Sequence, residues 1–264
     1  APGTRLPIEP LLCERYGGVP EARGPRAGMV KLPAGRFTMG SDDHYPEEAL
    51  SREVKVDGFW IDRHDVTNAQ FARFVAATGH VSVAERTPTV AAKAGAAPAA
   101  GSAVFVFPKD GRPGAWRFIA GADWRHPQGP GSSIEGRDNH PVVHIAYEDA
   151  LAYARWLGRE LPTEAQWEYA SRGGLDAQPY AWGEAFTPDG RPMANTWQGP
   201  FPLVNTGDDR FMGTSPVGCF PANGYGLYDM AGNVWQWTRS WYRPGHSGQA
   251  ETNPLGPHQR DAYD

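Results

Sequence analysis

The sequence predicts a single α+β domain with little regular secondary structure and long stretches of irregular backbone. Three observations support this prediction: the chain has 264 residues, it contains 32 glycines and 25 prolines, and it shows no repeat and no domain linker. Glycine and proline favour turns over helices and strands. Hydrophobic residues make up 40% of the chain, which is enough for a sizeable core in a domain of this length.

The N-terminal region is expected to begin with an extended arm and to continue into strands. Residues 1–28 are rich in proline, glycine and charge and form the arm, whereas residues 29–264 form the domain. Segment 29–41 alternates apolar and polar side chains and is interpreted as a strand or hairpin. Segment 54–67 shows a second strand pattern, with a turn predicted at Asp57-Gly58.

Three helices are predicted, and two of them share one start signal. Thr67 and Thr163 each precede a glutamine by three residues, Gln70 and Gln166, which is the pattern of a capping box. The remaining helix is expected over about 147–157. Glycines are expected to end the three helices, at Gly79, Gly158 and Gly173-Gly174.

Three shorter features complete the local predictions. Asp65 lies just before the first helix, whose positive end favours a carboxylate. Residues 91–101, AAKAGAAPAAG, have almost nothing to bury and are expected to form a surface excursion. The VFVF segment at 104–107 predicts a short strand.

The composition argues against several classes of function. A net charge of −5 provides no basic surface for nucleic acid, and no apolar run is long enough to span a membrane. The sequence contains no GxSxG elbow, no phosphate-binding P-loop and no HExxH zinc motif.

His140 and His144 lie four residues apart, but Pro141 disfavours a shared helix face. We therefore interpret these histidines as structural residues of a loop.

The two cysteines, Cys13 and Cys219, are interpreted as buried or loop thiols. They lie far apart in the sequence and lack the spacing of a metal site. A single pair does not make a disulfide scaffold, and free cysteine often packs as a small hydrophobic residue.

Two segments place oxygen-bearing side chains among glycine turns, which is typical of binding sites for hard cations. Calcium takes six to eight oxygen ligands, many of them backbone carbonyls, and glycine lets several carbonyls turn inward. The alternative is a network of Asx turns that holds no ion. The oxygen-bearing residues are Asn195, Asp208 and Asp209 in the first segment, and Asp229, Asn233 and Gln236 around Gly232 in the second.

The ten tryptophans are interpreted first as core residues, because each buries a large area. A subset that lines a binding groove is the alternative.

Three long segments carry a resemblance to a known family. They read MVKLPAGRFTMGS, HPVVHIAYEDALAYARWLGRELPTEAQWEYASRGG and GYGLYDMAGNVWQWT. In order and spacing they resemble the formylglycine-generating enzymes, also called sulfatase-modifying factors. The resemblance covers about residues 28–256 and implies a low-regularity fold related to C-type lectins, held together by two structural Ca²⁺ ions.

The resemblance also implies the residues of these sites. Where Gln236 stands the family commonly has glutamate, so the second calcium site is expected to bind more weakly or to hold another ion. An aromatic groove for an extended peptide is expected at Pro202, Phe220 and Trp235. The implied calcium ligands are Asn195, Thr196, Asp209 and Phe211 in the first site, and Asp229, Gly232, Val234 and Gln236 in the second.

The activity implied is oxidation of a cysteine to Cα-formylglycine within a Cys-x-Pro-x-Arg motif of an unfolded sulfatase. The family uses O₂ and a copper(I) ion held by two thiolates, which are ligands that select Cu(I). Those thiolates lie in a C-terminal GGS-x-x-C…C-x-RYR segment, and the sequence ends before it, at HQRDAYD. The domain is therefore expected to lack its C-terminal segment, and neither Cys13 nor Cys219 matches the thiolate pair.

Two alternatives to the oxidase stay open. A non-catalytic module that binds peptides or proteins on the same scaffold agrees with the missing thiolates and with an altered loop at 87–103. An iron-dependent sulfoxide synthase would need a separate helical domain with a histidine triad, which the sequence does not contain. The start at Ala-Pro-Gly and the calcium sites favour a location outside the cytoplasm.

Overall fold

The computed structural model describes residues 13, 24–88, 99–245 and 247–258. The strands are β1 (Met29–Leu32), β2 (Gly35–Met39), β3 (Arg52–Val56), β4 (Phe59–Asp62), β5 (Gly101–Val106), β6 (Ala115–Ala120) and β7 (Glu251–Thr252). The helices are α2 (Asn68–Thr78), α3 (Tyr147–Trp156) and α4 (Glu164–Arg172), with 3₁₀ turns η1 (Pro46–Glu48), η2 (Val83–Glu85) and η3 (Pro188–Gly190).

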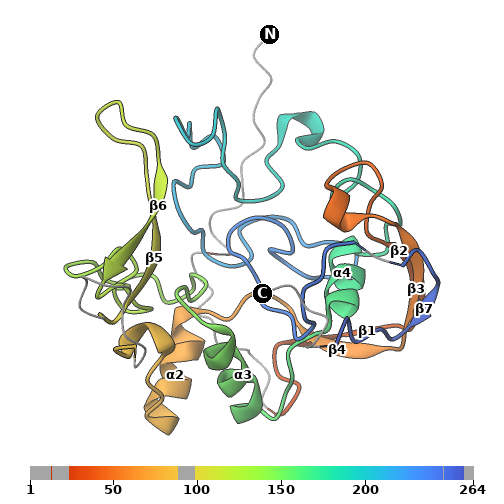
Figure 1. Cartoon of the computed structure of the whole chain (residues 1–264), viewed down its shortest axis with the longest axis horizontal. Coiled ribbons are helices and arrows are strands. Elements are labelled where there is room, and N and C mark those ends of the chain that lie inside the picture. The colour runs from red at the N-terminus through yellow and green to blue at the C-terminus, as the bar shows by residue number, and fades with distance from the viewer. Residues whose placement is uncertain (1–12, 14–23, 89–98, 246, 259–264) are drawn as a thin grey trace.

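The described strands form three small sheets rather than one large one. β1 pairs with β4, and β5 pairs with β6, both antiparallel. β3 lies between β2, its antiparallel partner, and β7, which runs parallel to it. Figure 1 shows β2, β3 and β7 at one edge of the molecule and the β5–β6 hairpin on the other side, with irregular loops of the C-terminal half between them.

The interpretation of segment 29–41 as one strand or hairpin was wrong. β1 and β2 do not pair with each other but belong to different sheets. They are separated by Pro33-Ala34, and proline cannot donate to a strand ladder. Asp57-Gly58 does separate β3 from β4, but these residues form a two-residue link between strands of different sheets rather than a turn.

Both capping boxes are confirmed. Thr67 accepts a hydrogen bond from the amide of Gln70, and Thr163 accepts one from the amide of Gln166. The two helices end at Gly79 and Gly173, which adopt the left-handed conformation as glycine does at a helix end.

Helix α3 has no threonine cap and begins differently. The Oδ2 of Asp149 accepts a hydrogen bond from the amide of Ala146 at 3.0 Å, at the start of the helix. The same carboxylate accepts from Val83 in η2 and contacts Nε2 of His80 at 2.8 Å. Asp149 therefore fixes the start of α3 and ties it to the turn after α2.

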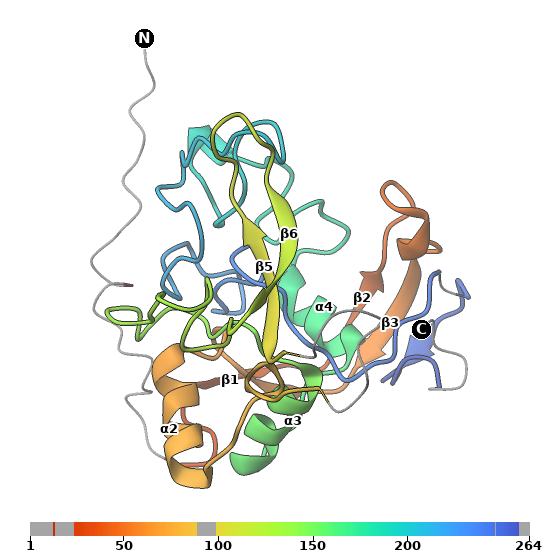
Figure 2. The ribbon, with the colours of Figure 1, turned by 60° about the vertical axis from the view of Figure 1, so that its left-hand side comes forward.

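The core is divided into two main clusters. One packs α4 against the β1–β4 and β2–β3 strands, with the rings of Phe37 and Tyr169 5.5 Å apart. The other is an aromatic cluster between α2 and α3, where the ring of Phe71 meets that of Trp124 edge to face at 5.3 Å. Figure 2 shows α2 and α3 side by side at the base of the β5–β6 hairpin.

The interpretation of the cysteines as free thiols was wrong. Cys13 and Cys219 form a disulfide that closes a sequence separation of 206 residues. Both are buried, and they pack with Phe220 and Phe211 in a third, smaller cluster. A pairing over this distance depends on the path of the chain between the two residues, which their spacing in the sequence does not reveal.

The observed architecture is a small domain of mixed helices and strands, as the sequence predicts. After α4, the described residues contain only η3 and the two-residue strand β7. Most of the proposed surface excursion at 91–101 lies outside the described residues, whereas the strand predicted at 104–107 appears as β5. None of the described helices has the length and apolar character needed to cross a membrane.

Candidate functional site

The first candidate cation site is centred on the carboxylate of Asp209, which is 0% exposed. Its Oδ2 accepts a hydrogen bond from the amide of Thr196 at 2.9 Å, and its Oδ1 accepts one from the amide of Phe211 at 3.0 Å. The structure thus brings these predicted residues, 13 and 2 positions from Asp209, together around one carboxylate.

Gln198 belongs to the same site, although the sequence analysis did not identify it. Its Nε2 donates to Oδ2 of Asp209 at 3.0 Å and to Oγ1 of Thr196 at 3.1 Å. Its Oε1 accepts from the amide of Asp209 at 3.3 Å. The only signal in the sequence is its position two residues after Thr196, within the segment that carries the family resemblance.

The donor set of this site fits a hard cation. The carbonyl oxygens of Thr196 and Phe211 accept no hydrogen bond from the described residues, and no described cationic side chain pairs with Asp209. Oxygen ligands of this kind suit Ca²⁺. The amide donors around the carboxylate equally match the ion-free Asx network, because in both arrangements the buried carboxylate of Asp209 accepts hydrogen bonds from nearby backbone amides.

The second candidate site is centred on Asp229. Its Oδ2 accepts from the amide of Gly218 at 2.7 Å, and burial raises the pKa of this carboxyl to about 6 despite that hydrogen bond. The carbonyl oxygens of Gly232 and Val234 accept no hydrogen bond from the described residues. These carbonyl oxygens are available to coordinate a hard cation, as are the carbonyl oxygens of the first site.

Gln236 is held on both sides of its carboxamide. Nε1 of Trp167 donates to its Oε1 at 2.8 Å, and its Nε2 donates to the carbonyl oxygen of Asp229 at 2.9 Å. An indole N–H can only donate, so Trp167 fixes which end of the amide is oxygen. Gln236 therefore bridges Trp167 to Asp229 and brings no charge to the site.

The two sites touch each other. The amide of Asn233, between Gly232 and Val234, donates to the carbonyl of Asn195 at 2.9 Å. Gly232 has a φ of +74°, and a Cβ on it would meet the same Asn195 oxygen at 2.3 Å. The backbone of the second site thus rests directly on the first.

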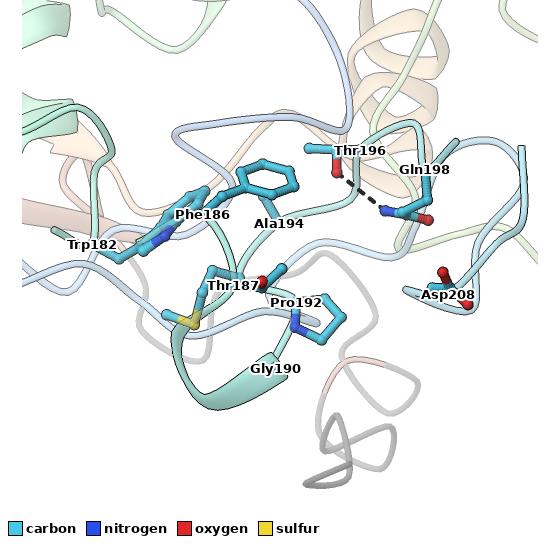
Figure 3. Close-up of a pocket in the computed structure, with 10 residues that line it drawn as sticks. Trp182, Phe186, Thr187, Gly190, Pro192, Ala194, Thr196, Gln198 and Asp208 are labelled. Atoms are coloured by element: carbon cyan, nitrogen blue, oxygen red, sulfur yellow. Dashed lines mark hydrogen bonds between the residues drawn. The ribbon is translucent and has the colours of Figure 1, made fainter. Parts of the chain in front are cut away.

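A pocket of about 150 Å³ opens beside the first site (Figure 3). Trp182 and Phe186 form one end of its lining, and Thr196, Gln198 and Asp208 lie towards the other. Its volume is below the roughly 300–1,000 Å³ of typical small-molecule sites. The pocket has room for one side chain of a partner rather than for a large cofactor.

The three predicted groove residues have different surroundings. Trp235 is 98% exposed, so its ring is free to meet a partner. Phe220 is only 4% exposed and packs beside the disulfide, with its ring 6.0 Å from that of Phe211. Pro202 is partly buried, and its carbonyl accepts from the amide of Gly114 at 2.8 Å.

An aromatic cluster beside Pro202 was not predicted. The ring of Phe105 on β5 stacks with that of Phe201 at 5.7 Å and meets Trp197 edge to face at 5.8 Å. Phe201 is 64% exposed. Because Phe105 and Phe201 are far apart in sequence, only the docking of the β5–β6 hairpin on the 197–204 loop reveals this surface.

His140 and His144 are each hydrogen-bonded to a neighbouring loop. Nδ1 of His140 contacts Oγ1 of Thr214 at 3.0 Å, and Nε2 of His144 contacts the carbonyl of Pro127 at 2.8 Å. Within the described part of the chain, no three side chains of His, Cys, Asp or Glu are grouped to hold a metal. Any cation at the two candidate sites would therefore depend on carbonyl and amide oxygens as well as carboxylates.

The residues described do not fit a copper(I) site. Such a site needs free thiolates, and the sulfur atoms of Cys13 and Cys219 are bonded to each other.

Comparison with known proteins identifies the family of this chain. Residues 18–259 match the family model described as a sulfatase-modifying factor enzyme 1-like domain. A formylglycine-generating enzyme of Mycobacterium tuberculosis is 53% identical over 226 residues, covering 83% of this chain and 75% of the relative. An inactive Cα-formylglycine-generating enzyme 2 of Mus musculus is 42% identical, covering 82% and 70%.

A solved structure supports the same assignment at the level of the fold. PvdO from Pseudomonas aeruginosa superposes with a TM-score of 0.58 and 27% identity, covering 88% of this chain and 77% of that one. The family model spans both candidate cation sites and all three predicted groove residues. The chain therefore belongs to the sulfatase-modifying factor family.

Proposed function

We propose that this protein is an oxidase that converts a cysteine of a sulfatase to Cα-formylglycine. The substrate is an unfolded sulfatase segment with a Cys-x-Pro-x-Arg motif, and the reaction uses O₂ and copper(I). The observation that carries this proposal is the 53% identity to a formylglycine-generating enzyme over 226 residues, which cover 83% of this chain. We also propose that the enzyme acts outside the cytoplasm.

Calcium at the two candidate sites would have a structural role. Asp209 and the carbonyls of Thr196 and Phe211 would hold one ion, and Asp229 and the carbonyls of Gly232 and Val234 would hold the other. An ion at each site would neutralise a buried carboxylate and order irregular backbone, which has few ladder hydrogen bonds of its own.

The exposed aromatic residues support an extended peptide as the partner. Trp235 and Phe201 present their rings to solvent, and the proline of the Cys-x-Pro-x-Arg motif is suited to packing on aromatic surfaces. An unfolded segment can lie along such a surface because its backbone is not yet committed to a fold of its own.

The copper part of the proposal depends on the family resemblance alone. The described cysteines do not fit that site, so no step of the reaction is assigned to residues of this chain.

The decisive experiment is conversion of a Cys-x-Pro-x-Arg peptide by the full-length protein with copper(I) and O₂. Mass spectrometry should detect the mass change at the cysteine, and a hydrazide probe should label the new aldehyde. A matched Ser-x-Pro-x-Arg peptide should stay unlabelled. If the cysteine peptide also stays unlabelled, the oxidase proposal is wrong.

A second candidate is a non-catalytic module that binds peptides or proteins. The 42% identity to an inactive relative and the disulfide between Cys13 and Cys219 favour it. This function predicts that the full-length protein binds the Cys-x-Pro-x-Arg peptide in calorimetry but forms no aldehyde. Aldehyde formation would exclude it.

A further inference from the structure

The disulfide between Cys13 and Cys219 lies next to the second candidate cation site. Cys219 directly follows Gly218 in the chain, and the amide of Gly218 donates to Oδ2 of Asp229 at 2.7 Å. Asp229 is the acidic ligand proposed for that site. The bond that fixes Cys219 therefore also holds, one residue away, the amide that orients this carboxylate.

The same disulfide packs towards the first candidate cation site. Cys13 and Cys219 are buried together with Phe220. Phe211 packs against this cluster, with its ring 6.0 Å from that of Phe220. The amide of Phe211 donates to Oδ1 of Asp209 at 3.0 Å, and its carbonyl is one of the oxygens proposed for the ion. A shift of Phe211 would thus disturb two groups of the first site.

Asn139 links the two ends of the disulfide to each other. Its Nδ2 donates to the carbonyl of Cys13, and its own carbonyl accepts from the amide of Val217 at 2.9 Å. Val217 is buried and lies two residues before Cys219. The position of segment 217–219 therefore depends on the chain around Cys13 as well as on its own loop.

We propose that the disulfide between Cys13 and Cys219 controls the affinity of both candidate cation sites, so that its formation favours Ca²⁺ binding and its reduction favours Ca²⁺ release. This inference rests on the calcium part of the proposed function. In the reduction, a dithiol supplies two electrons and two protons, the S–S bond breaks to give two thiols, and the dithiol becomes a cyclic disulfide. The amides that orient the two site carboxylates then lose a shared anchor, and such supporting groups strongly affect metal affinity.

The coupling acts equally in both directions. If the disulfide raises the affinity for Ca²⁺ by a given factor, Ca²⁺ favours the disulfide over the two thiols by the same factor. Couplings between sites are typically about 5- to 150-fold. Because both cysteines are buried, a dithiol reaches them only when the surrounding chain opens locally, and bound Ca²⁺ opposes that opening.

The first experiment measures Ca²⁺ affinity by calorimetric titration of the full-length protein. It compares the oxidised protein with the double variant Cys13→Ser and Cys219→Ser. The oxidised protein should bind two ions, and the double variant should bind them about 5- to 150-fold more weakly. Equal affinities would overturn the coupling. No binding by the oxidised protein would overturn both the coupling and the calcium proposal, whereas the oxidase proposal is decided separately by aldehyde formation.

The second experiment measures the effect of Ca²⁺ on the disulfide. The oxidised protein is equilibrated with mixtures of reduced and oxidised dithiol, in EDTA or in Ca²⁺, and the free thiols are alkylated and quantified by mass spectrometry at Cys13 and Cys219. Ca²⁺ should raise the ratio of reduced to oxidised dithiol at half-reduction by the combined factor found in the titrations. The same ratio in EDTA and in Ca²⁺ would contradict the coupling.

A control variant separates this coupling from a general loss of stability. Phe71 is buried in the aromatic cluster between α2 and α3, so Phe71→Leu should lower the unfolding temperature without changing Ca²⁺ affinity. The double serine variant should lose Ca²⁺ affinity even where near-UV circular dichroism shows it to be folded. An equal loss of affinity in Phe71→Leu would show that any destabilisation weakens the sites, and would overturn a specific role of the disulfide.

Discussion

Asn195 and Asn233 are hydrogen-bonded to each other twice. The amide of Asn233 donates to the carbonyl of Asn195 at 2.9 Å, and Nδ2 of Asn195 donates to Oδ1 of Asn233 at 3.2 Å. Oδ1 of Asn233 also accepts from the amide of Ser215 at 2.9 Å. One side chain therefore joins both candidate cation sites to the 213–215 turn.

Replacement of Asn233 should destabilise this junction in two separable ways. Asn233→Gly keeps the positive φ of +60° but removes the side-chain bonds, and should lower the free energy of unfolding by about 1–3 kcal/mol. Asn233→Ala should cost about 1–2 kcal/mol more, because alanine disfavours the left-handed region. Urea unfolding of both variants measures the difference, and equal stabilities would show that φ is not strained there.

Gly232→Ala should be more harmful than an alanine at a glycine of the same φ. A Cβ at Gly232 would meet the Asn195 carbonyl oxygen at 2.3 Å, whereas one at Gly226, with a φ of +75°, would meet nothing within 4 Å. Both variants share the left-handed penalty of roughly 1–2 kcal/mol, so any excess for Gly232→Ala reports the clash. Denaturant titrations of the two variants compare them, and equal losses would contradict the close packing of the two sites.

The disulfide should make stability depend on redox conditions. Reduction, or the double replacement Cys13→Ala and Cys219→Ala, should lower the free energy of unfolding by about 2–4 kcal/mol, because the closed loop restricts the unfolded chain. Thermal unfolding with and without a phosphine reductant measures this. The double variant should show no response to the reductant, and an equal response in both proteins would place the effect elsewhere.

Replacing Trp235 should weaken peptide binding, whereas replacing Phe220 should lower the stability of the fold. Trp235→Ala should change the free energy of unfolding by less than about 0.5 kcal/mol, as is usual at exposed positions, while weakening the binding of a Cys-x-Pro-x-Arg peptide. Phe220→Ala should cost about 3–5 kcal/mol, because it empties a packed core site. Peptide titration and urea unfolding of both variants test this, and unchanged peptide affinity in Trp235→Ala would remove that residue from the groove.

Protonation of His140 should lower the free energy of unfolding at mildly acidic pH. Burial, and then the nearby charge of Arg137, lower its pKa from 6.5 to about 4. The unfolded chain therefore takes up this proton first, and the contribution of His140 to stability falls as the pH drops from about 6.5 to about 4. His140→Gln should flatten the pH dependence of unfolding in that window, and an unchanged profile would contradict the shift.

Local features of the fold were largely predictable. Capping boxes at Thr67 and Thr163 depend on residues three positions apart, and Gly79 and Gly173 end helices through their own φ. Helix α3 was also predicted at the correct residues. The role of Asp149 at its start was not predicted, because that carboxylate joins α3 to η2, which lies far from it in the sequence.

The candidate sites were predictable only in part. Asp209 and Asp229 stand out as acids among glycine turns, and the family resemblance adds the carbonyl donors. Gln198 was not assigned to the first site, because nothing in its local sequence indicates which residues lie opposite it in the fold.

The sequence by itself determined the fold class, the family, the helix ends and the two acidic turns, because each of these is written in short or contiguous patterns. Tertiary structure alone decided the bond between Cys13 and Cys219 and the contact of Trp167 with Gln236. These relationships join residues far apart in the chain. They depend on how the loops pack. In a domain with few strands and helices, no periodic pattern in the sequence predicts that packing.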